Sequence, residues 1–282
     1  MVLTKTIDEI RDCVREKRKN GNIIGFVPTM GALHEGHIKL IEIALEKCDS
    51  VVVSIFVNPE QFGPNEDFET YPRELENDLE KCRELGVDII FAPDRDMMYD
   101  ERKFFSIQIR DLNKYMCGAS RPGFFEGVVL VVNKLFNIVE PDIAVFGQKD
   151  IQQFLILKRM VHEFNHNIEL VMGPVVRAGD GLALSSRNAY LSDEERKIAP
   201  GLHRSLRYIK KQVLGGIDEP GLLISHQKSE LEAKGFKIDY LDVYSRQTLE
   251  PVKTLSKSEN YIVAGAVYLG KTRLIDNIIF QY

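Results

Sequence analysis

The sequence predicts an α/β protein built on a parallel sheet and followed by a smaller α+β domain. Over the first part of the chain, apolar and β-branched runs alternate with segments of helical periodicity, an order that favours parallel strands joined by right-handed crossovers. Beyond Arg177 helical segments come first and strand-like runs then follow one another. We therefore expect a parallel-sheet domain over residues 1–176 and an α+β domain over residues 177–282.

The elements of the first domain follow from apolar spacing. A helix is expected around Ile10, ended by Asn20-Gly21, and Pro72 is expected to open a later helix. The run Val51–Val57 is almost unbroken in β-branched residues, as a buried parallel strand requires. The other expected strands and helices are strands at 23–27, 88–91, 143–146, 168–171 and 175–176, an extended run at 104–109, and helices at 38–45, 128–138 and 151–161.

The second domain begins with a polar loop, residues 179–188. Ser192 and Glu195 form a capping-box pattern, which predicts a helix from there to about Val213, where Gly215-Gly216 ends it. A further helix is expected at 220–234. Three strand-like runs close the chain, at 237–244, 261–268 and 272–279.

Composition and charge exclude several classes of function. The chain has 37 basic and 42 acidic residues and a net charge of −5, so no overall positive field favours nucleic acid or a membrane surface. The N-terminal segment lacks the apolar core of a signal peptide, and no run approaches the roughly 20 residues that span a bilayer. The 4 cysteines never form C-x-x-C, so neither a zinc site nor a redox pair is indicated. We expect a cytoplasmic protein.

The most informative stretch is Phe26–His37, a strand, a loop with two glycines and a helix start. Backbone N–H groups at such a junction favour an anion such as phosphate. His34 and His37 share one face of the helix start. Taken alone, the pair is also compatible with helix capping, whereas the zincin pattern needs a spacing of four on an established helix. The glycines and the strand-to-helix context favour phosphate binding.

Two further loops carry charges that suit a nucleotide. Lys149 and Asp150 follow a predicted strand, where a lysine offers a point charge to phosphate and an aspartate accepts from ribose hydroxyls. Ser185, Ser186 and Arg187 together are able to clamp a triphosphate. Taken alone, each of these loops is more often an ordinary solvated turn or polar loop than a binding site.

Together these motifs resemble one family. PTMGALHEGH, FVNPEQF, RPGFFEGV, GQKD followed by Gln152-Gln153, and LSSRN occur here in the order found in the pantoate-β-alanine ligases. The resemblance covers nearly the whole chain, and the glutamine of GQKD is a mild variation. Those ligases belong to the nucleotidylyltransferases that carry an HxGH motif. The resemblance implies a Rossmann-like first domain and a C-terminal lid domain.

The resemblance also implies roles for individual residues. His37, His34 and Lys149 are expected to be catalytic, with His37 assisting the departing pyrophosphate. Gln61 and Gln153 are expected to bind pantoate, and Gln61 with Asn58 to bind β-alanine. The expected ATP-binding residues are Met30, Gly31, Ala32, Leu33, His34, Glu35, Gly36, His37, Gly147, Gln148, Lys149, Asp150, Val176, Leu184, Ser185, Ser186 and Arg187.

The implied reaction is the ATP-dependent condensation of pantoate with β-alanine through an acyl adenylate. Mg²⁺ is expected to neutralise the pyrophosphate without a dedicated protein cage. A homodimer is implied by the resemblance alone. Two other classes remain open from the residues: a nucleotidylyltransferase that places AMP on a phosphate, and a non-enzymatic adenine-nucleotide sensor.

Overall fold

The computed structural model describes residues 1–64, 66–102 and 104–282, so that Asn65 in the 63–69 loop and Lys103 lie outside it. The described chain forms two compact units. The first comprises Met1–Ile109, Pro122–Gln148 and Gln153–Pro174, and the second comprises Arg110–Arg121, Lys149–Gln152 and Val175–Tyr282. Two short segments from the first part of the sequence thus belong to the second unit.

The first unit contains a 6-stranded sheet in the order β1-β4-β3-β2-β5-β6, and all its strand pairs are parallel. This confirms the predicted parallel α/β sheet. The strands are β1 (Val2–Thr4), β2 (Ile24–Thr29), β3 (Ser50–Ile55), β4 (Ile89–Phe91), β5 (Ile143–Gly147) and β6 (Glu169–Gly173).

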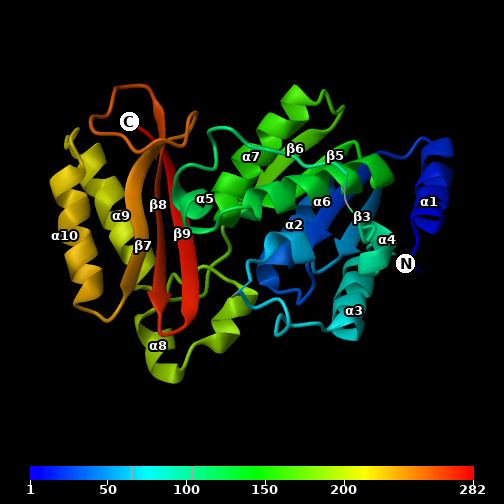
Figure 1. Ribbon diagram of the computed structural model, residues 1–282, viewed down its shortest axis with the longest axis horizontal. Helices are drawn as coiled ribbons and strands as arrows, with labels where there is room; N and C mark the ends of the chain where they lie inside the picture. Colours follow the sequence, from blue (N-terminus) through cyan, green and yellow to red (C-terminus); the bar gives the residue numbers. More distant parts are fainter. Residues whose placement is uncertain (65, 103) are drawn as a thin grey trace. The chain divides into compact units, whose positions relative to one another are not determined.

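Helices pack on this sheet (Figure 1). They are α1 (Ile7–Lys19), α2 (Glu35–Lys47), α3 (Leu75–Leu85), α4 (Arg95–Met98), α6 (Phe124–Val139) and α7 (Ile151–Glu163). The apolar faces of α2 and α3 meet the sheet in one core, which includes Ile41, Ala44, Leu79 and Val53. The predicted helical periodicity therefore marks the buried faces correctly.

Strands β2 and β5 mark the point where the strand order reverses direction. β2 continues to β3 and β4 on one side of the sheet, whereas β5 and β6 lie on the other side. In open parallel sheets, ligands gather at the carboxyl ends of the strands at such a point. Thr29 ends β2 and Gly147 ends β5 there.

The second unit contains a 3-stranded antiparallel sheet of β7 (Lys237–Ser245), β8 (Asn260–Leu269) and β9 (Thr272–Gln281), with β8 in the centre. Its helices are α5 (Met116–Ser120), α8 (Asp193–Ile198), α9 (Gly201–Leu214) and α10 (Gly221–Glu232). Leu202, Leu206 and Ile209 of α9 pack with Val263 and Val267 of β8 in one core. Figure 1 shows α9 and α10 beside this sheet. The predicted α+β character is confirmed.

One helix prediction in the second unit is wrong for an identifiable reason. The single helix expected from Ser192 to Val213 is two helices, α8 and α9, which are separated at Ala199-Pro200. Proline lacks the N–H that would continue α8 and clashes with the preceding turn. The predicted capping box is present, since the Ser192 hydroxyl accepts from the Glu195 N–H and the Glu195 carboxylate accepts from the Ser192 N–H.

Other expected elements are absent from the structure or begin at a different residue. Residues 104–109 form no strand, and Phe104 and Phe105 are 75% and 91% exposed, so this apolar run lacks the burial that stabilises a strand. Residues 175–176 form no strand either. The helix expected to open at Pro72 begins only at Leu75. The short strand β1 was not predicted.

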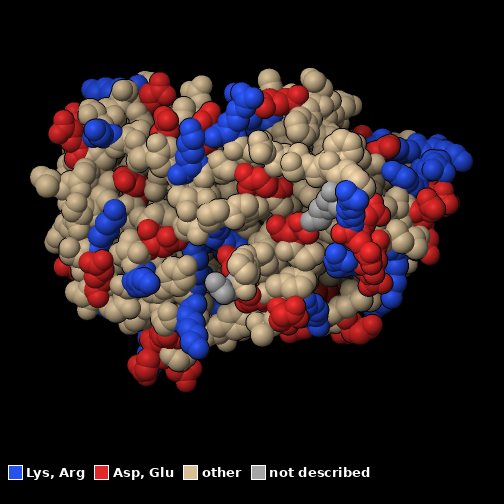
Figure 2. Space-filling model, viewed as in Figure 1, with Lys and Arg blue, Asp and Glu red and all other residues tan. Residues whose placement is uncertain are grey.

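No helix within the described residues is long and apolar enough to cross a membrane. On the face shown in Figure 2, acidic and basic side chains are interspersed. This distribution agrees with the small net charge of −5.

Candidate active site

His34 and His37 form the start of helix α2. His34 is the N-cap residue, and its Nδ1 accepts a 3.0 Å hydrogen bond from the Gly36 N–H. The Nδ1 of His37 accepts from the His34 N–H over 3.4 Å. The two rings stack with centroids 4.1 Å apart. The histidines therefore build a capping box, so capping and phosphate binding are not competing interpretations of this pair.

This capping geometry fixes the tautomer of both rings. A neutral imidazole carries one proton, and a nitrogen that accepts a hydrogen bond does not hold it. Because Nδ1 is the acceptor in His34 and in His37, the proton of each neutral ring is on Nε2. Each ring is thereby a hydrogen-bond donor through Nε2 beside a helix N-terminus, a combination that suits an anion.

Gly36 is required by the same cap. A Cβ atom at this position would lie 2.7 Å from Cε1 and 2.9 Å from Nδ1 of the His34 ring. A side chain at position 36 would therefore displace the ring that caps the helix. Close packing against the His34 ring therefore explains why the HEGH stretch has glycine at this position.

Asp78 of α3 holds the loop that precedes α2, a role that the sequence did not reveal. Its buried carboxylate accepts hydrogen bonds from the Ala32 N–H at 2.8 Å and from the Leu33 N–H at 2.7 Å. Lys81, one turn later, donates to the Leu33 carbonyl at 2.6 Å. Burial raises the pKa of the Asp78 carboxyl, and the two N–H donors partly offset that rise. The one available sequence signal was a charge between Leu75 and Leu79, on the buried face of the helix.

Gln61 lies in the short helix η1 (Pro59–Gln61), directly after β3. Its Nε2 is 3.1 Å from the sulfur of Met30, and its Oε1 accepts from the Asn58 amide at 2.9 Å. The structure therefore brings Gln61 beside the first loop, as expected for residues of one site.

The Asn58 side chain holds the Pro59–Gln61 turn in place through hydrogen bonds. Its side chain is 1% exposed. The Oδ1 atom accepts from the Glu60 N–H and the Tyr99 hydroxyl, and the Nδ2 atom donates to Gln61 and to the Gly127 carbonyl. A side chain used so fully within the protein acts as a positioning group for Gln61.

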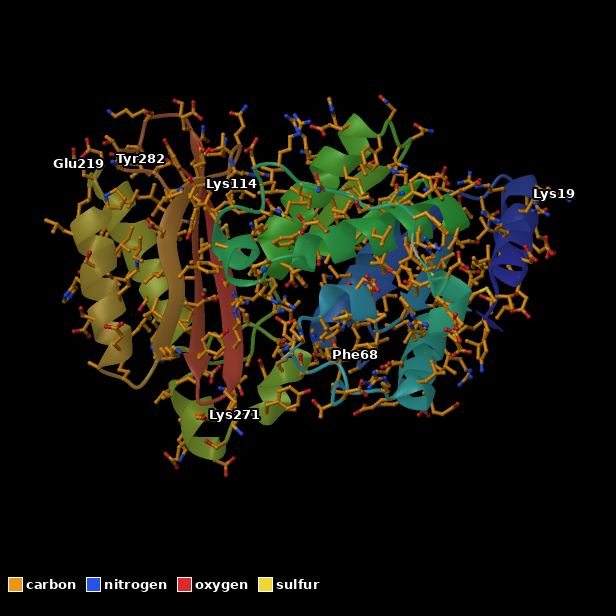
Figure 3. The ribbon with its side chains drawn as sticks, in the orientation of Figure 1. Lys19, Phe68, Lys114, Glu219, Lys271 and Tyr282 are labelled. Atoms are coloured by element: carbon orange, nitrogen blue, oxygen red, sulfur yellow. The ribbon has the colours of Figure 1, made fainter. Side chains whose placement is uncertain are left out.

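The segment after Gln61 is fixed by aromatic packing. The ring of Phe62 meets the rings of Phe68 and Tyr71 edge-on, with centroids 5.3 Å and 5.8 Å away. The Arg73 guanidinium lies 5.2 Å from the centroid of Phe68, the residue labelled in Figure 3. Such contacts each add about 0.5–1.5 kcal/mol beyond area burial. They hold the chain that leaves the Gln61 turn.

The GQKD stretch follows β5 as the short helix η2 (Gln148–Asp150). Gly147 and Gln148 belong to the first unit, and Lys149 and Asp150 to the second. The Lys149 ammonium lies 3.5 Å from the Asp150 carboxylate. Gln153 is half-buried in the first turn of α7. The prediction that Lys149 lies at a turn is confirmed.

Val176 and the LSSR stretch lie at the two ends of one hairpin in the second unit. The Leu184 N–H donates to the Val176 carbonyl at 3.0 Å, and Arg177 and Ala183 form an antiparallel bridge. The Ser185 hydroxyl then caps the short helix η3 (Ser186–Tyr190) by accepting from the Arg187 N–H at 3.3 Å. The structure thus places the adenine candidate beside the phosphate candidates.

The predicted site residues therefore form two groups, each assembled within its own unit. The first unit holds the loop Met30–Leu33, the stretch His34–His37, Asn58 with Gln61, Gly147-Gln148, and Gln153. The second unit holds Lys149-Asp150, Val176 and Leu184–Arg187.

Comparison with known proteins identifies the family. Residues 2–279 match the family model described as pantoate-beta-alanine ligase. The chain belongs to the pantoate-β-alanine ligase family. It is accordingly an enzyme, a ligase, and the sensor alternative is excluded.

Individual relatives match this ligase along essentially its whole length. Pantothenate synthetase from Fervidobacterium nodosum is 49% identical over 281 residues, which is 100% of both chains. Pantothenate synthetase from Pseudomonas fluorescens is 48% identical over 280 residues, covering 99% of this chain and 97% of the relative.

Solved structures agree with this membership. The crystal structure of pantothenate synthetase from Thermus thermophilus matches with a TM-score of 0.90 and 42% identity, covering 99% of each chain. The structure of the ligase from Francisella tularensis, complexed with beta-gamma ATP and beta-alanine, matches with a TM-score of 0.83 and 34% identity, covering 99% of this chain and 97% of that one. The Rossmann-like fold and its small second domain are thus those of the family.

Proposed function

We propose that this ligase condenses pantoate with β-alanine, using ATP, through a pantoyl adenylate, and that it releases AMP and pyrophosphate. The observation that carries the proposal is the pair His34 and His37, whose Nδ1 atoms accept backbone hydrogen bonds at the start of α2, which leaves Nε2 as the donor of each neutral ring. Family membership and the relative complexed with an ATP compound and β-alanine support the same reaction.

The chemistry explains why a nucleotide is needed. A carboxylate is a poor acyl donor because its leaving group would be oxide. In the first step, a pantoate carboxylate oxygen attacks the α-phosphorus of ATP, and the bond from that phosphorus to the bridging oxygen breaks, so that pyrophosphate leaves. In the second step, the β-alanine amine attacks the acyl carbon, the bond to AMP breaks, and the nitrogen loses a proton as the amide forms.

The first step brings two anions together, so positioning and electrostatic stabilisation carry most of the catalysis. We assign phosphate contact to the Nε2 groups of His34 and His37, with His37 assisting the leaving pyrophosphate, and we assign the main positive charge to Lys149. The wider ATP set comprises Met30–Leu33, Glu35, Gly36, Gly147, Gln148, Asp150, Val176 and Leu184–Arg187.

Gln61 and Gln153 are assigned to pantoate. A neutral amide both donates and accepts, and therefore suits the hydroxyl groups and carboxylate of this substrate. Gln61 is also assigned to β-alanine. The hydrogen bond from Asn58 to Gln61 Oε1 fixes which way the Gln61 amide is turned, so the part proposed for Asn58 in β-alanine binding is exerted through Gln61.

Mg²⁺ is proposed to accompany ATP. Among the described residues, no group of three or more His, Cys, Asp or Glu side chains could hold a metal ion. Mg²⁺ that accompanies a nucleotide is usually carried chiefly by phosphate oxygens and water. When bound, Mg²⁺ neutralises charge on the pyrophosphate.

The test is AMP formation with each substrate omitted in turn. Dependence on ATP, pantoate and β-alanine together is the expected result. Pyrophosphate release with ATP and pantoate alone, in a single turnover, reports the adenylate. If AMP forms equally well without pantoate, the proposal is wrong.

The same assay addresses AMP transfer to a phosphate acceptor. Pantetheine phosphate replaces pantoate in a parallel reaction, and pyrophosphate release driven by it alone would favour that alternative. The family resemblance also leads us to propose a homodimer, which light scattering of the purified protein tests directly.

A further inference from the structure

Strand β9 carries two adjacent polar residues that are almost fully buried. Asp276 is 4% exposed and Asn277 is 1% exposed. Successive residues of a strand face opposite sides of the sheet, so the two side chains meet different neighbours. Buried polar groups need partners, and the identity of those partners shows what the strand holds in place.

Asp276 fixes the hairpin that joins Val176 to the LSSR stretch. Its two carboxylate oxygens accept from the Arg177 guanidinium at 2.6 Å and 2.8 Å, and Oδ2 also lies 3.1 Å from Nδ1 of His203 in α9. The same guanidinium donates to the Gly181 carbonyl at 3.1 Å inside the hairpin. One carboxylate thus fixes both the base and the turn of that hairpin.

Asn277 fixes the GQKD stretch from the other face of the sheet. Its Nδ2 donates to the Lys149 carbonyl at 3.0 Å, across a separation of 128 residues in the sequence. Its backbone N–H donates to Asp276 Oδ1 at 2.7 Å. The Asp276 carboxylate thus also binds the backbone of its neighbour, and the two side chains connect one strand to two distant segments.

We propose that Asp276 and Asn277 are positioning residues for ATP, with Asp276 setting the hairpin from Val176 to Arg187 and Asn277 setting the backbone of Lys149. This inference rests on the proposed function, which assigns those two segments to the nucleotide. Neither residue touches ATP in this scheme, and each acts through the segment that it holds.

Energetics favour positioning over simple stabilisation. A buried ion pair often contributes no more to stability than apolar residues of the same volume, because both charges must be desolvated. The bidentate geometry between Asp276 and Arg177 does, however, define one orientation of the residue next to Val176. An amide donor to a carbonyl likewise fixes one backbone position for Lys149.

The test compares Asn277→Leu with Thr272→Val. Both residues are buried polar residues of β9, but nothing assigns Thr272 to an ATP segment. In Asn277→Leu, we expect the Kd of a non-hydrolysable ATP analogue to rise about tenfold, the effect of one lost hydrogen bond. The KM values for pantoate and β-alanine should stay within about twofold of wild type, as should every constant of Thr272→Val.

Asn277→Ala provides a second variant if leucine prevents folding, because it adds no apolar bulk and removes the donor to the Lys149 carbonyl. Hydrogen exchange is then measured in the segment 147–153 and in β8. Faster exchange in the segment alone, with weaker binding of the analogue, supports positioning. An unchanged Kd in a folded variant, or equal rises in all three substrate constants, overturns the proposal.

Different results would contradict the proposed reaction and the positioning role of Asn277. If the wild-type protein binds the ATP analogue but shows no pantoate-dependent AMP formation, the proposed reaction is wrong, and the binding comparison still tests Asn277. If the wild-type protein is active and Asn277→Leu binds the analogue normally, the positioning inference alone is wrong.

Discussion

The Asp78 carboxylate accepts a 2.7 Å hydrogen bond from the backbone N–H of Leu33. Helix α3 thereby fixes a loop 45 residues earlier in the chain, directly before the histidine cap. The same carboxylate accepts from Ala32, a non-glycine residue with a φ of 50°. The loop is held in a conformation that it would not favour by itself.

We expect Asp78→Ala to reduce kcat/KM for ATP about tenfold to 100-fold, because two N–H groups lose their acceptor and the loop loses its fixed shape. The free energy of unfolding should fall by about 1–3 kcal/mol. Steady-state kinetics and urea unfolding measure both effects. Glu80→Ala, at an exposed position of the same helix, is the matched control. Unchanged ATP kinetics in a folded Asp78→Ala protein would refute this role.

Replacing His37 separates its two parts, helix cap and phosphate donor. His37→Ala should lose both, and His37→Gln should keep the cap, since glutamine serves at this position of a capping box. We expect pyrophosphate-ATP exchange to fall about 100-fold to 1,000-fold in both variants, the usual cost of one lost transition-state donor. Only His37→Ala should also lose stability. Exchange at the wild-type rate in either variant contradicts the proposed role, and His226→Ala, exposed on α10, is the control.

Gln153→Ala should raise the KM for pantoate about tenfold, with a smaller effect on the KM for ATP, because one amide contact to the smaller substrate is lost. Initial-rate kinetics with each substrate varied separately give these constants. Lys158→Ala, an exposed change in the same helix, should alter neither. Equal shifts for pantoate and ATP would count against a pantoate contact.

Gly127→Ala should lower the free energy of unfolding and also impair the binding of pantoate. An added Cβ would lie 1.9 Å from the Glu60 carbonyl oxygen, so either α6 or the Gln61 turn must move. We expect a loss of about 1–3 kcal/mol in stability and a raised KM for pantoate. Gly221→Ala, where the new Cβ meets nothing within 4 Å, is the control. Crystallography of a folded variant would show which element moved, and an unmoved turn with normal kinetics would disprove the link.

The Asp276 carboxylate predicts a defined acid sensitivity. Burial would raise its pKa, but hydrogen bonds from His203 and Arg177 outweigh burial and lower the pKa below the ordinary 3.8. The unfolded chain then binds the proton more tightly, so the carboxylate stabilises the fold above pH 3.8, and this contribution is lost as the pH falls through the lower folded value. Urea unfolding of wild type and Asp276→Asn should differ most near neutral pH and converge in acid. A difference independent of pH would contradict this.

The sequence predicted the parallel sheet and the character of both domains because these depend on local patterns. Val51–Val53 are all fully buried, as their unbroken apolar run required. Strand β1 was missed because three residues carry too little pattern, and it is defined by its pairing with β4. Pro200 was a visible helix break that the longer apolar periodicity obscured.

The sequence motifs predicted candidate site residues, but the sequence did not predict the residues that hold those motifs in place. His34 and Gln61 stand in recognisable stretches, whereas Asp78 and Asn277 act through hydrogen bonds to backbone atoms far along the chain. A backbone N–H or carbonyl is present at every position, so no residue type in one segment indicates its partner in another. Charge or polarity on a buried helix or strand face was the only signal, and it does not name the partner.

The contact between Gly36 and the His34 ring explains why the H-x-G-H motif of this chain has glycine at its third position. In that pattern the glycine vacates the space that the first ring occupies, and both rings turn Nδ1 inward to the backbone. The H-E-G-H stretch of this chain therefore forms a helix start at which the proton of each neutral ring is on Nε2. We therefore expect that a larger residue in place of this glycine displaces the capping ring, even where both histidines are kept.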